Sequence, residues 1–385
     1  MLFQFHGCGV TMRIAIDYTS ALAQQGGIGR HTRELVAALA AQDADTAYLL
    51  FAAGQRADEL PTLPGPNFAW RATPVSELWL ARAWHRARLP IPIERWTGPI
   101  DLLHAPDFVL PPTRAGTRTV LTIHDLSFAR LPETASPRLA AYLNQVVPRS
   151  VRRADRVIAV SEATRQDVIA LYGAPPEKVT VIHNGVDARF HPVTDMGARQ
   201  ALRARYRLGD APYILAVGAV HPRKNYVRLV EAFHRLNRPD VRLVIAGGRG
   251  NPRGPLFARI AALGLTDSIR FAGFVGDADL PTLYSAAHVL AFPSIYEGFG
   301  LPALEAMACG TPVVASNTSS LPEIVGDSGL LVDPADVDAL AGALARALDD
   351  AALRAELIEK GLHRARRFTW AEAARQVRAV YGEWV

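Results

Sequence analysis

The stretch PSIYEGFGLPALEAMACG at residues 293–310 carries the strongest local signal of the fold. It follows the apolar run 289–292, which predicts a buried strand, and it passes through a glycine-containing loop into a segment with helical periodicity. Pro302 stands where a first helical residue is expected, and Gly310 stands where that helix should end. The stretch therefore predicts a strand–loop–helix unit of the kind that builds parallel α/β sheets.

Strand-like apolar runs alternate with helix-period segments along the rest of the chain, which is typical of parallel sheets covered by helices. In the first half the expected strands are 13–17, 48–51, 102–104, 120–124, 157–160 and 179–183. After a polar, arginine-rich stretch the pattern restarts, with expected strands at 213–217, 241–246, 269–271, 289–292 and 313–315. Two such units predict an α/β fold of two doubly wound domains that face a cleft, with ligands at the carboxyl ends of the strands.

Length and composition agree with this class. The 385 residues predict two domains at roughly 150 residues each, and no apolar stretch approaches the roughly 18 to 20 residues that span a membrane. Residues 1–11 show no signal-peptide pattern, and two cysteines favour a reducing compartment over a disulfide framework. The net charge of +5 is mild for a nucleic-acid binder. Only three of the 42 basic residues are lysines: Lys178, Lys224 and Lys360.

The loop ahead of the helix at 302–308 suits an anionic group. Backbone N–H groups at Gly300 and Leu301 fall at the expected helix N-terminus, an arrangement that holds phosphate. Glu297 and Glu305 flank the loop, and because carboxylates repel phosphate, neutral sugar hydroxyls suit them better. The alternative is that Glu305 complements the helix dipole and that Glu297 is a solvated loop residue.

A second strand end reads VGAVHPRKN at residues 217–225. The adjacent Arg223 and Lys224 suit a diphosphate, since arginine offers a planar fork and lysine a point charge. A solvated basic turn is the alternative. The scarcity of lysine in this chain favours a functional role for Lys224.

Two weaker motifs follow strands of the first half. GGIGR at residues 26–30 opens a helix and resembles a phosphate-approach loop, but Thr32 stands where the third glycine of a dinucleotide fingerprint would fall. That substitution disfavours a NAD-dependent oxidoreductase. His124, followed by Asp125, ends a buried strand and suits a role in orienting a sugar hydroxyl. A core or capping histidine is the alternative.

A metal site is not expected. The eleven histidines show no paired spacing. The Asp-x-Asp pairs at 43–45, 277–279 and 336–338 fall at expected helix ends or starts, where aspartate caps are common.

Residues 76–96 mix tryptophans with arginines. Trp79, Trp84 and Trp96 beside several arginines suit the surface of an anionic membrane. The alternative is a surface helix whose aromatic side packs inward.

Taken together, the motifs resemble the family 4 retaining glycosyltransferases, which have the GT-B architecture. The resemblance runs from Met12 nearly to the C-terminus and rests on GGIGR (26–30), IHDL (123–126), VSEAT (160–164), HNGVD (183–187), PRKN (222–225) and the two-glutamate loop (297–305). It implies an acceptor-binding Rossmann-like domain at 12–195 and a nucleotide-sugar-binding one at 205–367. It also implies a C-terminal helix at 368–385 that packs back on the first domain.

The resemblance also implies roles for single residues. Glu305 would hold the ribose hydroxyls and Glu297 the hydroxyls of the donor sugar. The diphosphate would be neutralised by Arg223 and Lys224, with backbone at Gly300 and Leu301. Gly27 would let the first-domain loop approach the donor, and His124 would contact the transferred sugar, so that Glu297 and His124 are the catalytic candidates.

The implied reaction is a metal-independent transfer with retention that needs no cofactor. Its expected donor is GDP-mannose, and its acceptor a saccharide or lipid-linked saccharide in cell-surface polysaccharide synthesis. The implied place is the cytoplasm or the inner face of the cytoplasmic membrane, touched through residues 76–96, with no nucleic-acid partner. Transfer of rhamnose or glucose from a dTDP- or UDP-sugar, a nucleotide-sugar 2-epimerase and a non-catalytic sugar-nucleotide-binding partner remain alternatives.

Overall fold

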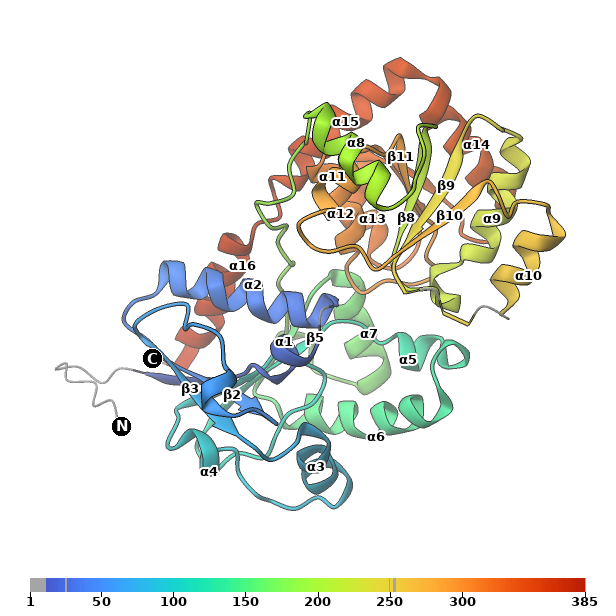
Figure 1. The fold of residues 1–385 in the computed structure, drawn as a ribbon. Helices are drawn as coiled ribbons and strands as arrows, with labels where there is room; N and C mark the ends of the chain where they lie inside the picture. Colours follow the sequence, from blue (N-terminus) through green and yellow to red (C-terminus); the bar gives the residue numbers. More distant parts are fainter. Residues whose placement is uncertain (1–11, 25, 249, 252–253, 385) are drawn as a thin grey trace.

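The computed structural model describes residues 12–24, 26–248, 250–251 and 254–384. It has two α/β lobes, one built on a seven-stranded sheet and the other on a six-stranded sheet (Figure 1). The paired strands of both sheets run parallel. The predicted α/β class, with two doubly wound Rossmann-like domains, is thereby confirmed. The expectation for residues 1–11 lies outside the described residues.

The N-terminal lobe orders its strands β3-β2-β1-β4-β5-β6-β7. In chain order these are β1 (Arg13–Asp17), β2 (Ala47–Ala53), β3 (Phe68–Thr73), β4 (Leu102–Ala105), β5 (Arg118–Ile123), β6 (Arg156–Ala159) and β7 (Val179–Val181). The helices of this part are α1 (Thr19–Ala23), α2 (Gly27–Gln42), α3 (Glu77–Ala81), α4 (Glu94–Thr97), α5 (Ser127–Arg130), α6 (Pro137–Arg153) and α7 (Glu162–Tyr172).

The C-terminal lobe repeats the plan with the order β10-β9-β8-β11-β12-β13. Its strands are β8 (Tyr213–Val217), β9 (Arg242–Ala246), β10 (Ile269–Gly273), β11 (Val289–Phe292), β12 (Val313–Ser316) and β13 (Leu330–Val332). The remaining helices are α8 (Met196–Arg205), α9 (Tyr226–Leu236), α10 (Pro255–Ala262), α11 (Leu280–Ser285), α12 (Leu301–Ala308), α13 (Leu321–Val325), α14 (Val337–Asp349), α15 (Ala351–Ala365) and α16 (Trp370–Tyr381).

Alternate residues of the central strands pack into different cores. In β1, Ile14 and Ile16 join the cluster that includes Leu35 of α2, whereas Ala15 joins the cluster on the opposite face. Helices on both faces explain why the three central residues of this strand are all apolar and buried rather than alternating. In each sheet the strand order reverses beside the first strand of the lobe, at β1/β4 and at β8/β11. Such switch points are where ligands bind in doubly wound sheets.

Strands β3 and β13 and helix α8 are among the elements that were not expected from the sequence. Strands β3 and β13 lie at sheet edges, where a strand needs no long apolar run: β3 contains Trp70 and Arg71, and β13 has only three residues. Helix α8 falls in the polar, arginine-rich stretch after the first lobe. It buries only Leu202 and packs against α11 of the second lobe.

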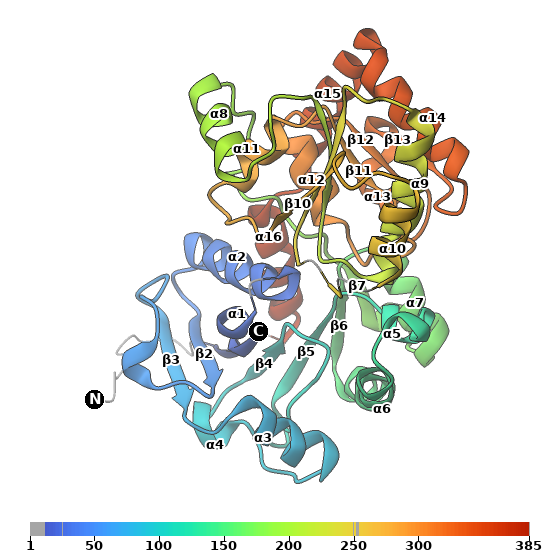
Figure 2. The same ribbon diagram turned by 45° about the vertical axis from the view of Figure 1, so that its right-hand side comes forward.

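The last helix, α16, returns to the N-terminal lobe. It packs along α2 in both ribbon views (Figures 1 and 2), and its Trp370 and Val377 join the core that contains Ile14. The phenol of Tyr381 lies 2.6 Å from Nδ1 of His104 on β4. The chain therefore crosses between the lobes twice, and the two crossings meet at a parallel bridge between Val186 and Thr369.

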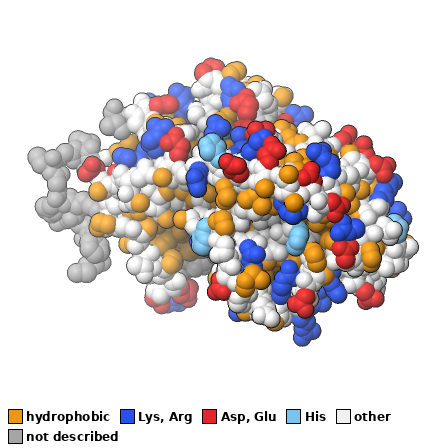
Figure 3. Space-filling view, turned by 90° about the horizontal axis from the view of Figure 1, so that it is seen from above, with side chains coloured by type: hydrophobic (Ala, Val, Ile, Leu, Met, Phe, Trp, Pro, Cys, Tyr) orange, Lys and Arg blue, Asp and Glu red, His pale blue; other side chains and the backbone are white. Residues whose placement is uncertain are grey.

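Acidic and basic side chains are interspersed over the face seen in Figure 3. Among the described helices, none combines the length with the apolar character needed to cross a bilayer.

Candidate functional site

Arg223 and Lys224 lie in a short turn of the loop that follows β8 and clamp one carboxylate. Lys224 Nζ lies 2.6 Å from Oε1 of Glu297, and Arg223 Nη1 lies 2.6 Å from Oε2 of the same side chain. The ammonium also sits 4.6 Å from the centre of the Phe292 ring. Two cations against one carboxylate leave a net positive charge at this strand end.

The clamp is built because β8 and β11 are neighbours in the sheet. The backbone N–H of Ile295 donates to the carbonyl of Arg223 (2.8 Å), and Arg223 Nη1 donates to the carbonyl of Tyr296 (2.7 Å). Asn225, buried in a left-handed conformation (φ 59°), donates its amide to the carbonyl of Pro293 (3.1 Å). The two strand-end motifs thus form one rigid unit.

Electrostatics keep Glu297 ionised. Burial raises the pKa of its carboxyl, but the charges of Lys224 and Arg223 outweigh burial and lower the pKa of Glu297 to about 2. Burial lowers the pKa of Lys224, and the charge of Glu297 opposes that shift.

Helix α12 begins beside this clamp. Gly300 is its N-cap with φ 108°, a conformation that L side chains rarely adopt, and Pro302 occupies the first turn. A Cβ at Gly300 would also come within 2.8 Å of Leu321. The predicted helix start and the cap at Gly300 and Leu301 therefore agree with the local geometry, and Gly310 follows the helix with φ 72°.

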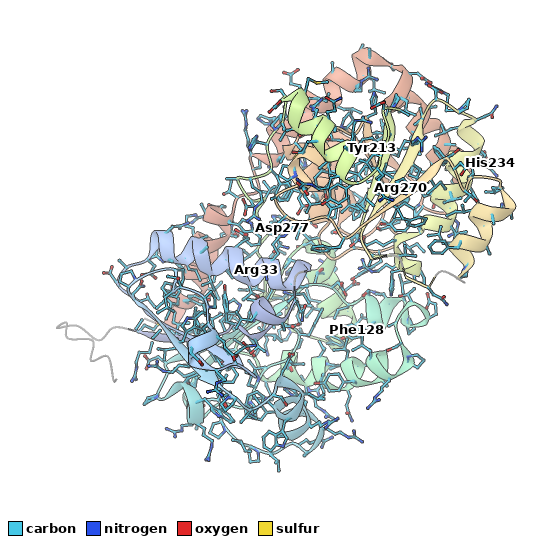
Figure 4. The ribbon with its side chains drawn as sticks, viewed as in Figure 1. Arg33, Phe128, Tyr213, His234, Arg270 and Asp277 are labelled. Carbon is cyan, nitrogen blue, oxygen red and sulfur yellow. The ribbon has the colours of Figure 1, made fainter. Side chains whose placement is uncertain are left out.

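Glu305 lies one turn further along α12 and has different partners. Its Oε2 accepts a hydrogen bond from the phenol of Tyr284 (2.7 Å), and its Oε1 contacts the guanidinium of Arg30. Arg30 belongs to the other lobe, in the first turn of α2, and its second nitrogen lies 2.6 Å from Oδ1 of Asp277. Figure 4 shows Asp277 between the lobes, over the helix that carries Arg33.

Burial is the main influence on Glu305. It raises the pKa of this carboxyl, although the charge of Arg30 and the hydrogen bond from Tyr284 act in the opposite direction. Only 5% of the Glu305 side chain is exposed. Both carboxylate oxygens thus already have protein partners.

His124 directly follows β5, on the side of the N-terminal lobe that meets the other lobe. Its Nε2 lies 2.7 Å from the carbonyl of Pro106, a contact in which the ring nitrogen must donate. Burial lowers the pKa of His124, so the ring is neutral at pH 7 and Nδ1 is its acceptor. Its ring meets that of His31 edge-on, with centroids 4.7 Å apart.

The two lobes touch directly at Gly298. A Cβ there would lie 1.8 Å from the carbonyl oxygen of His124, so only glycine fits. The carbonyl of Gly298 accepts hydrogen bonds from Ser161 Oγ (2.6 Å) and Thr164 Oγ1 (3.2 Å) at the start of α7. Next to it, Tyr296 donates its phenol to Oδ2 of Asp167 (2.5 Å). This contact explains why the IHDL, VSEAT and two-glutamate motifs occur together.

Gly27 opens α2, three residues before Arg30. A Cβ at Gly27 would meet no atom within 4 Å, whereas one at Gly29 would lie 1.9 Å from the carbonyl of Gln24. Gly29 is thus fixed by packing, and Gly27 leaves open space at the helix start.

The structure therefore brings Arg223, Lys224 and Glu297 into one cluster, with His124 across the seam. Glu305 stands in a second cluster with Arg30. Sequence reasoning gave no role in the site to Arg30, Asp277, Gly298 or Ser161, although all four lie inside motifs or pairs that it quoted. In the described part of the chain, no three His, Cys, Asp or Glu side chains gather as a metal ion would require.

Family models match both halves of the chain. The model described as Glycosyltransferase Family 4 matches residues 25–190, and the model for Glycosyl transferases group 1 matches residues 198–364. O-antigen chain mannosyltransferase B of Escherichia coli is 32% identical over 370 residues, which cover 92% of this chain and 95% of that protein. The chain belongs to glycosyltransferase family 4. It is an enzyme of that family, and the family membership predicted from the motifs is confirmed.

Other relatives of this family 4 glycosyltransferase support the same placement. D-inositol 3-phosphate glycosyltransferase of Salinispora tropica is 37% identical, covering 76% of this chain and 65% of that one. Sucrose-phosphate synthase of Thermosynechococcus elongatus superimposes with a TM-score of 0.74 at 26% identity, covering 97% and 98% of the two chains. The glycosyltransferase WaaG superimposes with a TM-score of 0.69 at 17% identity, covering 95% and 98%. These matches confirm the GT-B fold.

The tryptophans of segment 76–96 differ in their exposure. Trp84 and Trp96 pack inward on each other (5.6 Å between ring centroids) and on Phe51, as the inward-packing alternative required. Trp79 is 51% exposed, and it lies near the exposed Leu78.

Proposed function

We propose that this glycosyltransferase moves mannose from GDP-mannose onto a saccharide or lipid-linked saccharide, with retention and without a metal ion. The observation that carries the proposal is the clamp of Arg223 and Lys224 on Glu297, placed at the strand ends of the second lobe, next to the Gly298 contact with the backbone of His124. A nucleoside diphosphate needs a site of positive charge, and this cluster offers one in a place shielded from water.

In this proposal the donor lies along the strand ends of the C-terminal lobe. Lys224 and Arg223 face the diphosphate, together with backbone at Gly300 and Leu301. Glu297, kept ionised by its two cations, accepts hydrogen bonds from hydroxyls of the transferred sugar.

The acceptor side of the proposed site belongs to the N-terminal lobe. Across from it, Glu305 of the C-terminal lobe takes the ribose hydroxyls of the donor, and the open space at Gly27 lets the loop of the N-terminal lobe approach the donor. His124, whose acceptor nitrogen is Nδ1, receives a hydroxyl of the transferred sugar. This proposal keeps the predicted division into domains at 12–195, 205–367 and 368–385.

The proposed chemistry is a same-face substitution. The bond between the sugar C1 and the diphosphate oxygen breaks, and the acceptor hydroxyl attacks from the face that the diphosphate leaves. The proton of that hydroxyl passes to the departing phosphate oxygen. The growing charge on the leaving group is met by Lys224, Arg223 and the α12 N-terminus, each worth about 3 kcal/mol when well placed.

Mannose is the preferred sugar because several relatives are mannosyltransferases by name, among them the Escherichia coli protein and serotype-specific mannosyltransferase WbdA. The test is a transfer assay with GDP-mannose, UDP-glucose and dTDP-rhamnose, run with a saccharide acceptor and with EDTA. We expect turnover with GDP-mannose, an α-linked product by NMR and no loss with EDTA. Inversion at C1, or loss of activity with EDTA that added metal restores, would refute those parts of the proposal.

A lipid-linked acceptor would place the enzyme at a membrane surface, and we propose that the exposed part of segment 76–96 makes this contact. Leu78, Trp79 and Leu89 are 60%, 51% and 43% exposed beside the exposed Arg82 and Arg86. Flotation with anionic liposomes at low salt should recover the wild-type protein. A Leu78→Ser, Trp79→Ser double variant should float less, while Leu171→Ser, a matched exposed residue on α7, should float like the wild type.

A further inference from the structure

Arg30 makes an ion-pair contact between the lobes that the proposed function leaves unexplained. From the first turn of α2 its guanidinium reaches Glu305 on α12 and, 2.6 Å away, Oδ1 of Asp277. Tyr284 holds the other oxygen of Glu305. The carboxylate that the donor ribose is expected to use is therefore occupied on both oxygens and almost completely buried.

The two partners of Glu305 differ in how readily they can leave. Tyr284 lies on α11 in the same lobe, is fully buried and packs against Phe190 in that core. Arg30 comes from the opposite lobe, is 15% exposed, and has a second carboxylate, Asp277, to hold when it leaves Glu305. Any ligand that reaches Glu305 must therefore displace Arg30 rather than Tyr284.

We propose that Arg30 is a residue of the donor site that competes with the donor ribose for Glu305. In the structure Arg30 pairs with the buried carboxylate of Glu305, which would otherwise lie without a cation at a high cost. When the nucleotide arrives, the ribose hydroxyls take the Arg30 position on Glu305, and Arg30 keeps Asp277. This inference rests on the proposed assignment of Glu305 to ribose.

Competition has a measurable consequence. The apparent affinity of a ligand falls with the fraction of protein whose site is free, so removing Arg30 should tighten nucleotide binding. The gain should be larger for a ligand that makes more hydrogen bonds to Glu305. A ribonucleotide should thus gain more than its 2′-deoxy analogue.

The experiment titrates GDP, UDP and their 2′-deoxy analogues into the wild-type protein and into Arg30→Met by calorimetry. Arg30→Gln is measured beside it, so that the result does not depend on how one variant folds, and thermal unfolding checks each protein. Arg189→Met is the matched control, because Arg189 also spans the lobes. It contacts Glu34 and Asp277 but not Glu305.

We expect removal of Arg30 to lower the dissociation constant of the ribonucleotide about tenfold and that of the 2′-deoxy analogue about threefold or less. Arg189→Met should leave both within about twofold of the wild type. Weaker binding without Arg30, an equal gain for both nucleotides, or the same gain in Arg189→Met would each overturn the inference. Failure of the wild-type protein to bind either ribonucleotide would instead refute the proposed function, and the inference with it.

Discussion

Glu297 and Glu305 stand eight residues apart in one loop and helix, both buried, yet their surroundings shift their pKa values in opposite directions. Glu297 is clamped by Arg223 and Lys224 of its own lobe, which lower its pKa to about 2. Glu305 has one cation, Arg30, which comes from the other lobe, and burial raises its pKa.

The difference separates two kinds of charged site. The Glu297 clamp is complete within the second lobe and does not depend on where the first lobe lies. The Glu305 pair exists only while the lobes are in contact. We infer that the first cluster is preorganised for the diphosphate and the transferred sugar, whereas the second responds to the arrival of the nucleotide.

The largest effect on stability should come from breaking the clamp. Glu297→Gln leaves two buried cations without their carboxylate, and we expect a loss of about 3 kcal/mol in the free energy of unfolding at pH 7. The contribution of the wild-type carboxylate is present above its unfolded pKa of about 4.5 and is lost as pH falls toward 2. Urea unfolding of both proteins between pH 3 and pH 7 measures this. If the difference in unfolding free energy between the wild type and Glu297→Gln did not shrink at low pH, the charge of Glu297 would not stabilise the fold as described.

The next largest effect should be on catalysis and should come from replacing Lys224. Lys224→Ala removes the point charge proposed to meet the leaving diphosphate, and we expect kcat/KM for transfer to fall at least about a hundredfold. Lys360→Ala is the control, since Lys360 pairs with Glu356 and Asp327 on the surface. Near-normal turnover by Lys224→Ala would remove Lys224 from the mechanism.

Glu305→Gln should show the opposite pH dependence to Glu297→Gln, with a smaller amplitude. Because burial raises the pKa of Glu305, the wild-type carboxyl stabilises the fold best when protonated, below about pH 4.5. Relative to the glutamine variant, the wild type should lose stability as pH rises through the folded pKa. The same urea unfolding series measures this. If the difference in unfolding free energy from the wild type changed with pH in the same direction for both variants, the glutamates would not differ as described.

The smallest effect on stability should come from a single hydrogen bond between the lobes. Tyr296→Phe removes the hydrogen bond to Asp167 (2.5 Å) while keeping the ring, and we expect a loss of about 1 kcal/mol in unfolding free energy. The backbone carbonyl that holds Arg223 is unchanged, so transfer should fall no more than about threefold. A loss comparable to that of Lys224→Ala would mean that this phenol takes part in the chemistry.

Local patterns were enough to predict much of the fold. Apolar runs located the central strands, and the strand–loop–helix unit at 293–310 gave the α12 N-terminus, because both depend on neighbouring residues. The edge strands β7 and β10 were predicted, but the edge strands β3 and β13 were missed: Arg71 interrupts the apolar run of β3, and none of the three residues of β13 is buried. Helix α8 was missed because it buries a single leucine.

For the site, adjacency in sequence predicted the Arg223–Lys224 pair, and the sheet order then placed Glu297 beside it. The pairing of Arg30 with Glu305 joins residues 275 positions apart, and no local pattern encodes it. Ser161 illustrates a middle case: it lies in the VSEAT motif that the sequence offered and is the N-cap of α7, but its hydrogen bond to Gly298 depends on how the lobes meet.

The most direct test of the account is a crystal structure of the protein with GDP bound. We expect the diphosphate against Lys224 and Arg223 at the α12 N-terminus, the ribose hydroxyls on Glu305, and Arg30 withdrawn toward Asp277. A nucleotide bound elsewhere, or one bound here while Arg30 still holds Glu305, would contradict the distinction drawn between the two glutamates.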